Sequence, residues 1–182
     1  MRSKFLAMSL LSVFLISVLM TQASAAEVTN TKIGVVDIQR VVNASKVAKD
    51  VQVQLDQKRK SVQTQMAQQE KDLRALEQVL KTQRNSMSAE VFAKKQDDFK
   101  ANLRAAQKNF AKNRLAWEKA SDKSFKTIRN EAAKVIGDIA SEQGYAMVVA
   151  KDSVVLAEKS LDLTELALRN LDKKMTKLVV QW

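Results

Sequence analysis

The apolar residues in the middle of the chain recur at the spacing of an α-helix. In the first half of this region they step by seven, four, seven, three and four residues, and Gln69 is the single polar residue at a position of this seam. The second half shows a similar seam. Heptad-like steps of this kind are typical of coiled coils. The pattern predicts a long helical region from about Ala44 to Gln143. The seam residues are Leu55, Val62, Met66, Leu73, Leu76 and Leu80, then Phe92, Phe99, Leu103, Phe110 and Trp117.

A weak interruption divides this helical region into two arms. Asn85, Ser86 and Ser88 are residue types that cap helices and form turns. A narrow apolar seam buries too little surface for either arm to be stable alone. We therefore expect an antiparallel coiled-coil hairpin over residues 46–134, with its tip near residues 85–88. The alternative is one unbroken helix that continues through Ser88.

Short β-branched runs flank the helical region. The run from Ile33 to Ile38 predicts a buried strand followed by a helix. Two later runs, Tyr145–Ala150 and Val154–Ala157, are separated by three turn-forming residues, and this spacing predicts a β-hairpin. The expected body of the protein therefore has three short strands.

A final helix is expected after these strands. Asp162 and Glu165 form a capping-box-like pair, which predicts a helix that begins near Asp162 and continues to about Val179. We expect Trp182 to pack on the body.

The predicted fold class is α+β, mostly α, with a long hairpin projecting from a small body. The body comprises residues 26–45 and 135–182. Three strands leave two open sheet edges, and a domain of this size buries little apolar surface. Neighbouring chains are therefore expected to complete the sheet and the core in a small cyclic oligomer.

The first residues have the pattern of a secretory signal peptide. Arg2 and Lys4 precede the apolar run Phe5–Met20, and Ala23-Ser24-Ala25 provides the small residues of a cleavage site. We expect residues 1–25 to be removed near Ala25/Ala26, which places the mature protein in the periplasm of a cell with two membranes. A retained membrane anchor is the alternative, but the run is shorter than the roughly 20 residues that a spanning helix needs.

The positive charge is concentrated in the predicted hairpin. The chain has a formal net charge of +11, and removal of Arg2 and Lys4 lowers it to +9. Residues 46–134 contain 21 Lys or Arg against 11 Asp or Glu. Within Phe99–Trp117 there are five cations and no acid, and we call these five the cationic row. They are Lys100, Arg104, Lys108, Lys112 and Arg114. The row is either an ordinary solvated face or a binding surface for an anionic or unfolded partner.

The composition argues against catalysis. The chain contains no His and no Cys, which most hydrolytic triads and metal sites need. Neither a GxxxxGK[ST] nor a GxGxxG motif is present. We therefore expect a protein that is not an enzyme and that uses no cofactor and no metal. The seam aromatics are interspersed with cations, as in single-strand binders, but their heptad spacing favours packing, so no specific nucleic-acid partner is expected.

Taken in order along the chain, these features resemble the Skp/OmpH family of periplasmic chaperones. They are the signal peptide, "KIGVVDIQRVV", a basic helical hairpin, "QGYAMVVAKDSVVLAE" and "LDLTELALRNL". The resemblance spans essentially the whole mature chain and implies a homotrimer, with an intersubunit β-barrel body and hairpins that surround a cavity. It also implies that unfolded outer-membrane proteins are held there without ATP. Family members associate with lipopolysaccharide, but no residue of this chain matches such a site.

Three functions follow as hypotheses. The first is a holdase in which the cationic row forms part of the client-binding wall. The second is a periplasmic structural or adaptor protein whose arms dock one fixed partner. The third is a basic binder of polyanions such as lipopolysaccharide, nucleic acid or an anionic membrane surface, whose affinity would fall steeply with salt.

Overall fold

The computed structural model describes residues 31–182, so the predicted signal peptide over residues 1–25 lies outside the described residues. The described chain has two strands and four α-helices, with three short 3₁₀ turns between them. In order these elements are β1 (Ile33–Val36), α1 (Ile38–Ala44), α2 (Lys46–Thr82), η1 (Arg84–Ser86), α3 (Ala89–Glu142), β2 (Met147–Ala150), η2 (Lys151–Ser153), η3 (Lys159–Leu161) and α4 (Thr164–Lys174).

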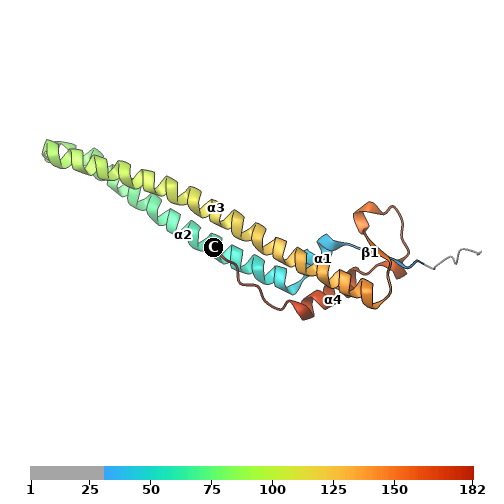
Figure 1. The fold of residues 1–182 in the computed structure, drawn as a ribbon. Helices are drawn as coiled ribbons and strands as arrows, with labels where there is room; N and C mark the ends of the chain where they lie inside the picture. Colours follow the sequence, from blue (N-terminus) through green and yellow to red (C-terminus); the bar gives the residue numbers. More distant parts are fainter. Residues whose placement is uncertain (1–30) are drawn as a thin grey trace, which may run out of the picture. The chain divides into compact units, whose positions relative to one another are not determined.

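The two long helices α2 and α3 form the predicted hairpin (Figure 1). Near the body the arms are joined by a hydrogen bond of 3.2 Å, in which the Trp117 indole donates to the Leu55 carbonyl. With 37 residues, α2 is about 55 Å long. The expectation of a long hairpin on a small β-containing body is confirmed, and the single unbroken helix is excluded.

Serines begin both arms. The Ser88 hydroxyl accepts a hydrogen bond from the Val91 amide at 3.3 Å, which starts α3 after the η1 turn. At the other end of the hairpin, buried Ser45 separates α1 from α2, and its hydroxyl accepts from the Ala48 amide at 3.2 Å. Both contacts satisfy amides that a helix N-terminus leaves without partners.

A glycine ends α3. Gly144 has a φ of 69°, a left-handed conformation that glycine adopts without steric cost. Its amide donates to the Ser141 carbonyl and the Tyr145 amide donates to the Ala140 carbonyl, at 3.4 and 2.8 Å. This Schellman arrangement turns the chain directly into β2.

The sheet differs from the prediction. β1 and β2 pair in parallel, with Ile33 opposite Met147 and Val36 opposite Ala150. The predicted strand Val154–Ala157 does not form, because η2 follows β2 at once and diverts the chain from an antiparallel return. The other side of β1 instead makes a single parallel bridge from Val35 to Asp162. The predicted β-hairpin is therefore wrong.

The core lies where α1, α4 and the body ends of α2 and α3 meet (Figure 1). It ends abruptly along the hairpin: among residues 56–119 none is fully buried. Leu55 and Ala120 are the last buried apolar residues of the two arms on the body side. The largest side chains that are completely buried include Leu55, Ile128, Ile139 and Leu171.

The last helix is shorter than expected. α4 begins at Thr164 and ends at Lys174, not near Val179. Asp162 accepts from the Thr164 amide at 2.9 Å, but Glu165 pairs with Arg40 of α1 instead of closing a capping box. After α4 the chain is extended and follows the hairpin, so that Trp182 lies beside Lys58 of α2 and not on the body.

Candidate functional site

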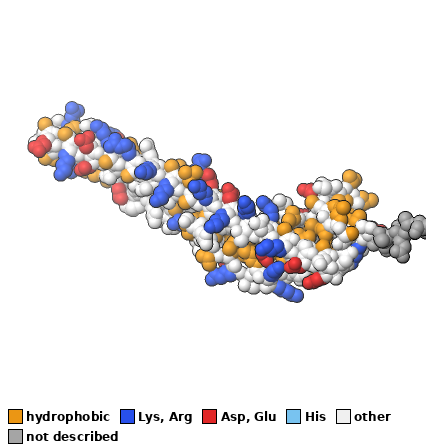
Figure 2. Space-filling view, viewed as in Figure 1, with side chains coloured by type: hydrophobic (Ala, Val, Ile, Leu, Met, Phe, Trp, Pro, Cys, Tyr) orange, Lys and Arg blue, Asp and Glu red, His pale blue; other side chains and the backbone are white. Residues whose placement is uncertain are grey.

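All five residues of the cationic row lie on α3 and are exposed. Phe99 and Trp117 are half-buried, and Lys108 and Lys112 lie on the other side of the helix from them, as 100° per residue requires. Figure 2 shows cations distributed along the hairpin, while apolar side chains gather on the body.

Two members of the row have acidic partners. The Lys100 ammonium lies 3.8 Å from Asp97, and the Arg114 guanidinium lies 3.0 Å from Glu118. Within residues 31–182, Arg104, Lys108 and Lys112 form no ion pair. The centre of the row is therefore uncompensated positive charge in solvent.

The opposite arm has a different surface. On α2, Glu70 pairs with Arg74 and Glu77 with Lys81, each four residues apart. The hydrogen bond from Lys81 lowers the pKa of the Glu77 carboxyl below its usual value. Such pairs neutralise α2 locally, whereas the Phe99–Trp117 stretch of α3 contains five cations and no acid.

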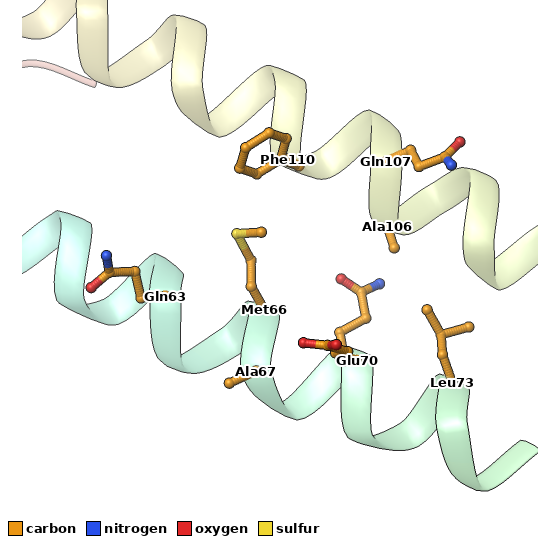
Figure 3. Close-up of a pocket in the computed structure, with 9 residues that line it drawn as sticks. Gln63, Met66, Ala67, Glu70, Leu73, Ala106, Gln107 and Phe110 are labelled. Carbon is orange, nitrogen blue, oxygen red and sulfur yellow. The ribbon is translucent and has the colours of Figure 1, made fainter.

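The seam between the arms is incompletely filled. A hollow of ≈ 480 Å³ lies between α2 and α3, lined by Met66 and Leu73 on one arm and by Ala106 and Phe110 on the other (Figure 3). A second hollow of ≈ 300 Å³ lies toward the body and is lined by Val62 and Trp117, among others. The middle of the hairpin therefore exposes apolar surface between its arms.

The residues of α3 that face α2 explain these hollows. Leu103 and Phe110, which the pattern predicted to pack in the seam, are 40% and 50% exposed. Ala106 and Asn113, seven and fourteen residues after Phe99, are half-buried instead. Phe110 does face α2 and lines both hollows, but a small and a polar residue beside it fill less space than large apolar ones and leave the seam incompletely packed.

Sequence reasoning missed the continuation of the row toward the body. Lys119 and Lys123 lie beside Lys108 and Lys112 around a hollow of ≈ 540 Å³ that Trp182 also lines. Leu115 is 54% exposed within this positive surface. The available signal was Leu115 itself, which is out of phase with the apolar seam of α3.

Other kinds of site find no support in the described part of the chain. Across residues 31–182 no group of three acidic side chains is arranged to hold a metal ion. None of the helices described is both long enough and apolar enough to cross a membrane.

Comparisons with known proteins agree with this architecture. A crystal structure of a protein described as an OmpH-like outer membrane chaperone from Caulobacter crescentus superposes with a TM-score of 0.78. The two sequences are 17% identical, and the match covers 83% of this chain and 89% of that one. No curated protein matches the sequence significantly. The family model described as outer membrane protein (OmpH-like) matches residues 32–171. The match covers most of the chain, and the protein therefore belongs to the OmpH-like family.

Proposed function

We propose that this protein is an ATP-independent holdase chaperone of the periplasm, which binds unfolded outer-membrane β-barrel proteins between basic helical arms. Membership of the OmpH-like family and the fold shared with an OmpH-like chaperone support a chaperone role. The observation that carries the proposal is the uncompensated charge of Arg104, Lys108 and Lys112 on a long solvent-exposed arm.

The physical basis is weak and reversible attraction. Unfolded barrel proteins expose apolar residues and unpaired strand edges that aggregate. Exposed cations attract acidic clients over a Debye length of about 8 Å at physiological salt. Individual contacts of this type contribute little free energy, so a client is held without being trapped. Partly exposed Leu103 and Phe110 add apolar contacts on the side of α3 that faces α2.

The test is client capture by a variant in which all five row cations are replaced by Gln. A urea-denatured outer-membrane barrel protein is diluted into buffer with the chaperone, and light scattering records aggregation at several salt concentrations. We expect capture to slow several-fold and its salt dependence to flatten. Unchanged capture would remove the row from the client-binding surface.

A matched control separates position from total charge. Five cations of α2 are replaced by Gln, which lowers the net charge equally. We expect this control to retain most of the capture rate, because four of these side chains lie next to acids in sequence or in ion pairs. The five are Arg59, Lys60, Lys71, Arg74 and Lys81.

Assembly into a homotrimer is part of the proposal. Val155 and Leu156 are almost entirely exposed, and Met147 is 55% exposed on β2. Among the described strands β2 pairs only with β1, so its other edge is open. Exposed apolar groups beside an open sheet edge favour association with further copies of the chain.

Solution mass tests the trimer. The unmodified protein is expected to have three times the mass of one chain by sedimentation equilibrium. Replacing Val155 and Leu156 with Asp should yield single chains, whereas the control Val53→Asp on exposed α2 should not. A single-chain mass for the unmodified protein contradicts the assembly.

The same aggregation assay distinguishes a polyanion binder from a holdase. A binder of polyanions, lipopolysaccharide among them, would retain folded anionic ligands as well as unfolded clients. We expect a folded acidic protein of equal charge to compete poorly with the denatured barrel protein. Equal competition would favour the polyanion function over the holdase.

A further inference from the structure

The extended segment at residues 175–182, which we call the tail, packs against the hairpin. It follows α4, lies outside the residues matched by the family model, and returns along the hairpin so that the C-terminus is drawn beside α2 (Figure 1). Its burial alternates as in a strand. Leu178 is half-buried and Val180 is 4% exposed, while Val179 between them is 65% exposed.

The side chain of Gln54 on α2 holds the tail by its backbone. The Gln54 amide nitrogen donates to the Leu178 carbonyl at 2.8 Å, and its oxygen accepts from the Val180 amide at 3.0 Å. One residue of a parallel strand makes this same pair of hydrogen bonds around the residue opposite it. Gln54 therefore offers a strand-like partner to any extended segment, since the contacts involve only backbone atoms of the tail.

Two cations hold the end of the tail. The Lys123 ammonium donates to the Gln181 side-chain oxygen at 2.5 Å. The Lys58 ammonium lies 5.5 Å from the centre of the Trp182 ring, a cation–π distance. Lys123 also lines the hollow of ≈ 540 Å³ that Trp182 lines. We call the surface formed by Gln54, Lys58, Lys123 and this hollow the tail groove.

The charges of the tail groove do not match the side chains of the tail. Four lysines and no carboxylate line the hollow, namely Lys108, Lys112, Lys119 and Lys123. Among its side chains the tail carries Lys177 and no acid. At the point of contact with Lys123 it offers the neutral amide of Gln181. A carboxylate at that position would form a charge-assisted hydrogen bond, which is stronger than the neutral contact observed.

We propose that the tail groove is a binding site for extended, acidic client segments with alternating apolar residues, and that the tail is its intramolecular competitor. This inference rests on the proposed chaperone function and names one recognition element within it. Backbone contacts from Gln54 make the site tolerant of sequence, and the lysines select acidic segments. A tethered tail is present at an effective concentration of roughly millimolar, so weakly binding segments are excluded while acidic ones displace it.

The test uses two fluorescein-labelled synthetic peptides. One has the sequence of residues 175–182 and the other carries Gln181→Glu. Their binding is measured by fluorescence anisotropy to the full chain and to a variant that lacks residues 177–182. We expect both peptides to bind the shortened chain about tenfold more tightly than the full chain, because their competitor is absent. The Gln181→Glu peptide should bind more tightly than the other in low salt.

Matched substitutions identify the groove. Gln54→Ala in the shortened chain should abolish peptide binding, whereas Gln57→Ala, an exposed glutamine one turn further along α2, should not change it. Equal binding of the peptides to the full and shortened chains would overturn the inference, as would insensitivity to Gln54→Ala.

A second design avoids truncation, since Val180 belongs to the core and its loss could unfold the body. The chain has no cysteine, so Leu115→Cys and Gln181→Cys, which line the same hollow, can be joined specifically by a short bismaleimide in the folded protein. The locked protein is expected to lose binding of the Gln181→Glu peptide at least tenfold relative to the unlocked one. Equal binding before and after crosslinking contradicts the inference.

The readouts separate this inference from the proposed function. If the locked and unlocked proteins suppress aggregation of the denatured barrel protein equally and bind the peptide equally, the tail groove fails and the holdase stands. If neither protein suppresses aggregation but only the unlocked one binds the peptide, the holdase fails and the groove stands.

Discussion

The body end of the hairpin and its outer part, residues 56–119, are built from the same two helices, yet they are packed in different ways. At the body end α1 and α4 cover the ends of α2 and α3, and residues such as Leu55 and Ile128 are completely buried. Beyond Leu55 the two helices pack mainly on each other, with only the end of the tail beside them, and no residue from 56 to 119 is fully buried. A helix pair alone buries a narrow stripe, whereas four elements enclose a core. The body therefore supplies stability, and the hairpin remains an open surface.

The largest expected difference between the two regions comes from replacing one leucine of α2 in each of them with alanine. Leu55→Ala removes a side chain with 0% exposure, and we expect a loss of about 2–5 kcal/mol in the free energy of unfolding. Leu73→Ala, at a half-buried hairpin position beside an existing hollow, should cost about 1 kcal/mol or less. Urea unfolding measures both. Equal losses would mean that the hairpin packs as tightly as the body.

Two glycines test the tightness of packing within the body. A Cβ on Gly34 of β1 would lie 2.5 Å from the Leu163 side chain, whereas one on Gly137 of α3 would meet nothing within 4 Å. We expect Gly34→Ala to destabilise by about 1–3 kcal/mol, because Leu163 is buried and cannot move freely. Gly137→Ala should stabilise α3 by about 0.5–1 kcal/mol. In thermal unfolding we expect a lower midpoint for Gly34→Ala and a higher midpoint for Gly137→Ala than for the unmodified protein.

The two serine N-caps allow the same substitution to be compared at the body end and at the tip of the hairpin. Ser45 is completely buried and its hydroxyl also donates to the Val42 carbonyl at 2.7 Å, whereas Ser88 caps an exposed helix end. Ser45→Ala should cost about 2 kcal/mol, because a buried carbonyl and a buried amide both lose a partner. Ser88→Ala should cost about 0.5–1 kcal/mol. A reversed order in urea unfolding would contradict the proposed division of stability.

The smallest expected effect is a dependence on pH. Hydrogen bonds from Lys151, and then from Thr164, lower the pKa of Asp162 from 3.8 to about 2. Because the folded-state pKa is depressed, the stabilisation is complete above about pH 4 and is lost as the pH falls toward 2. Allowing for partial solvent screening, its size is about 1 kcal/mol. Asp162→Asn should therefore lower stability at pH 5 but not near pH 2.

Glu77 is the matched carboxylate on the outer hairpin. It also accepts from a lysine, which lowers its pKa, but it is exposed. Glu77→Gln is expected to leave the unfolding midpoint unchanged at both pH values. A larger effect at Glu77 than at Asp162 would show that hairpin ion pairs contribute more than body contacts.

Local patterns were sufficient to predict the hairpin. The heptad steps, the turn residues near Ser88 and the lack of glycine and proline within the arms each act over a few residues, as helix formation does. The positive charge of α3 was likewise predictable from the sequence, because the charge of a lysine or arginine side chain does not depend on folding. The limit is the packing between the arms, since the spacing did not show that Ala106 and Asn113 would share the α2-facing side with Phe110 and leave it half exposed.

The strands were harder to predict because their partners lie far away in the chain. Met147–Ala150 was recognised as part of a strand, but its pairing with β1 in parallel depends on contacts more than one hundred residues apart. A β-branched run such as Val154–Ala157 is equally compatible with a strand and with an exposed loop.

The sequence by itself determined two slender helices, their turn and the sign of their charge, since each follows from residues that are neighbours in the chain. Only the tertiary structure decided which strand pairs with β1, where the core ends and where the tail lies. The contact of Gln54 with Leu178 and Val180 joins residues with no shared local pattern, because the folded body alone brings them together.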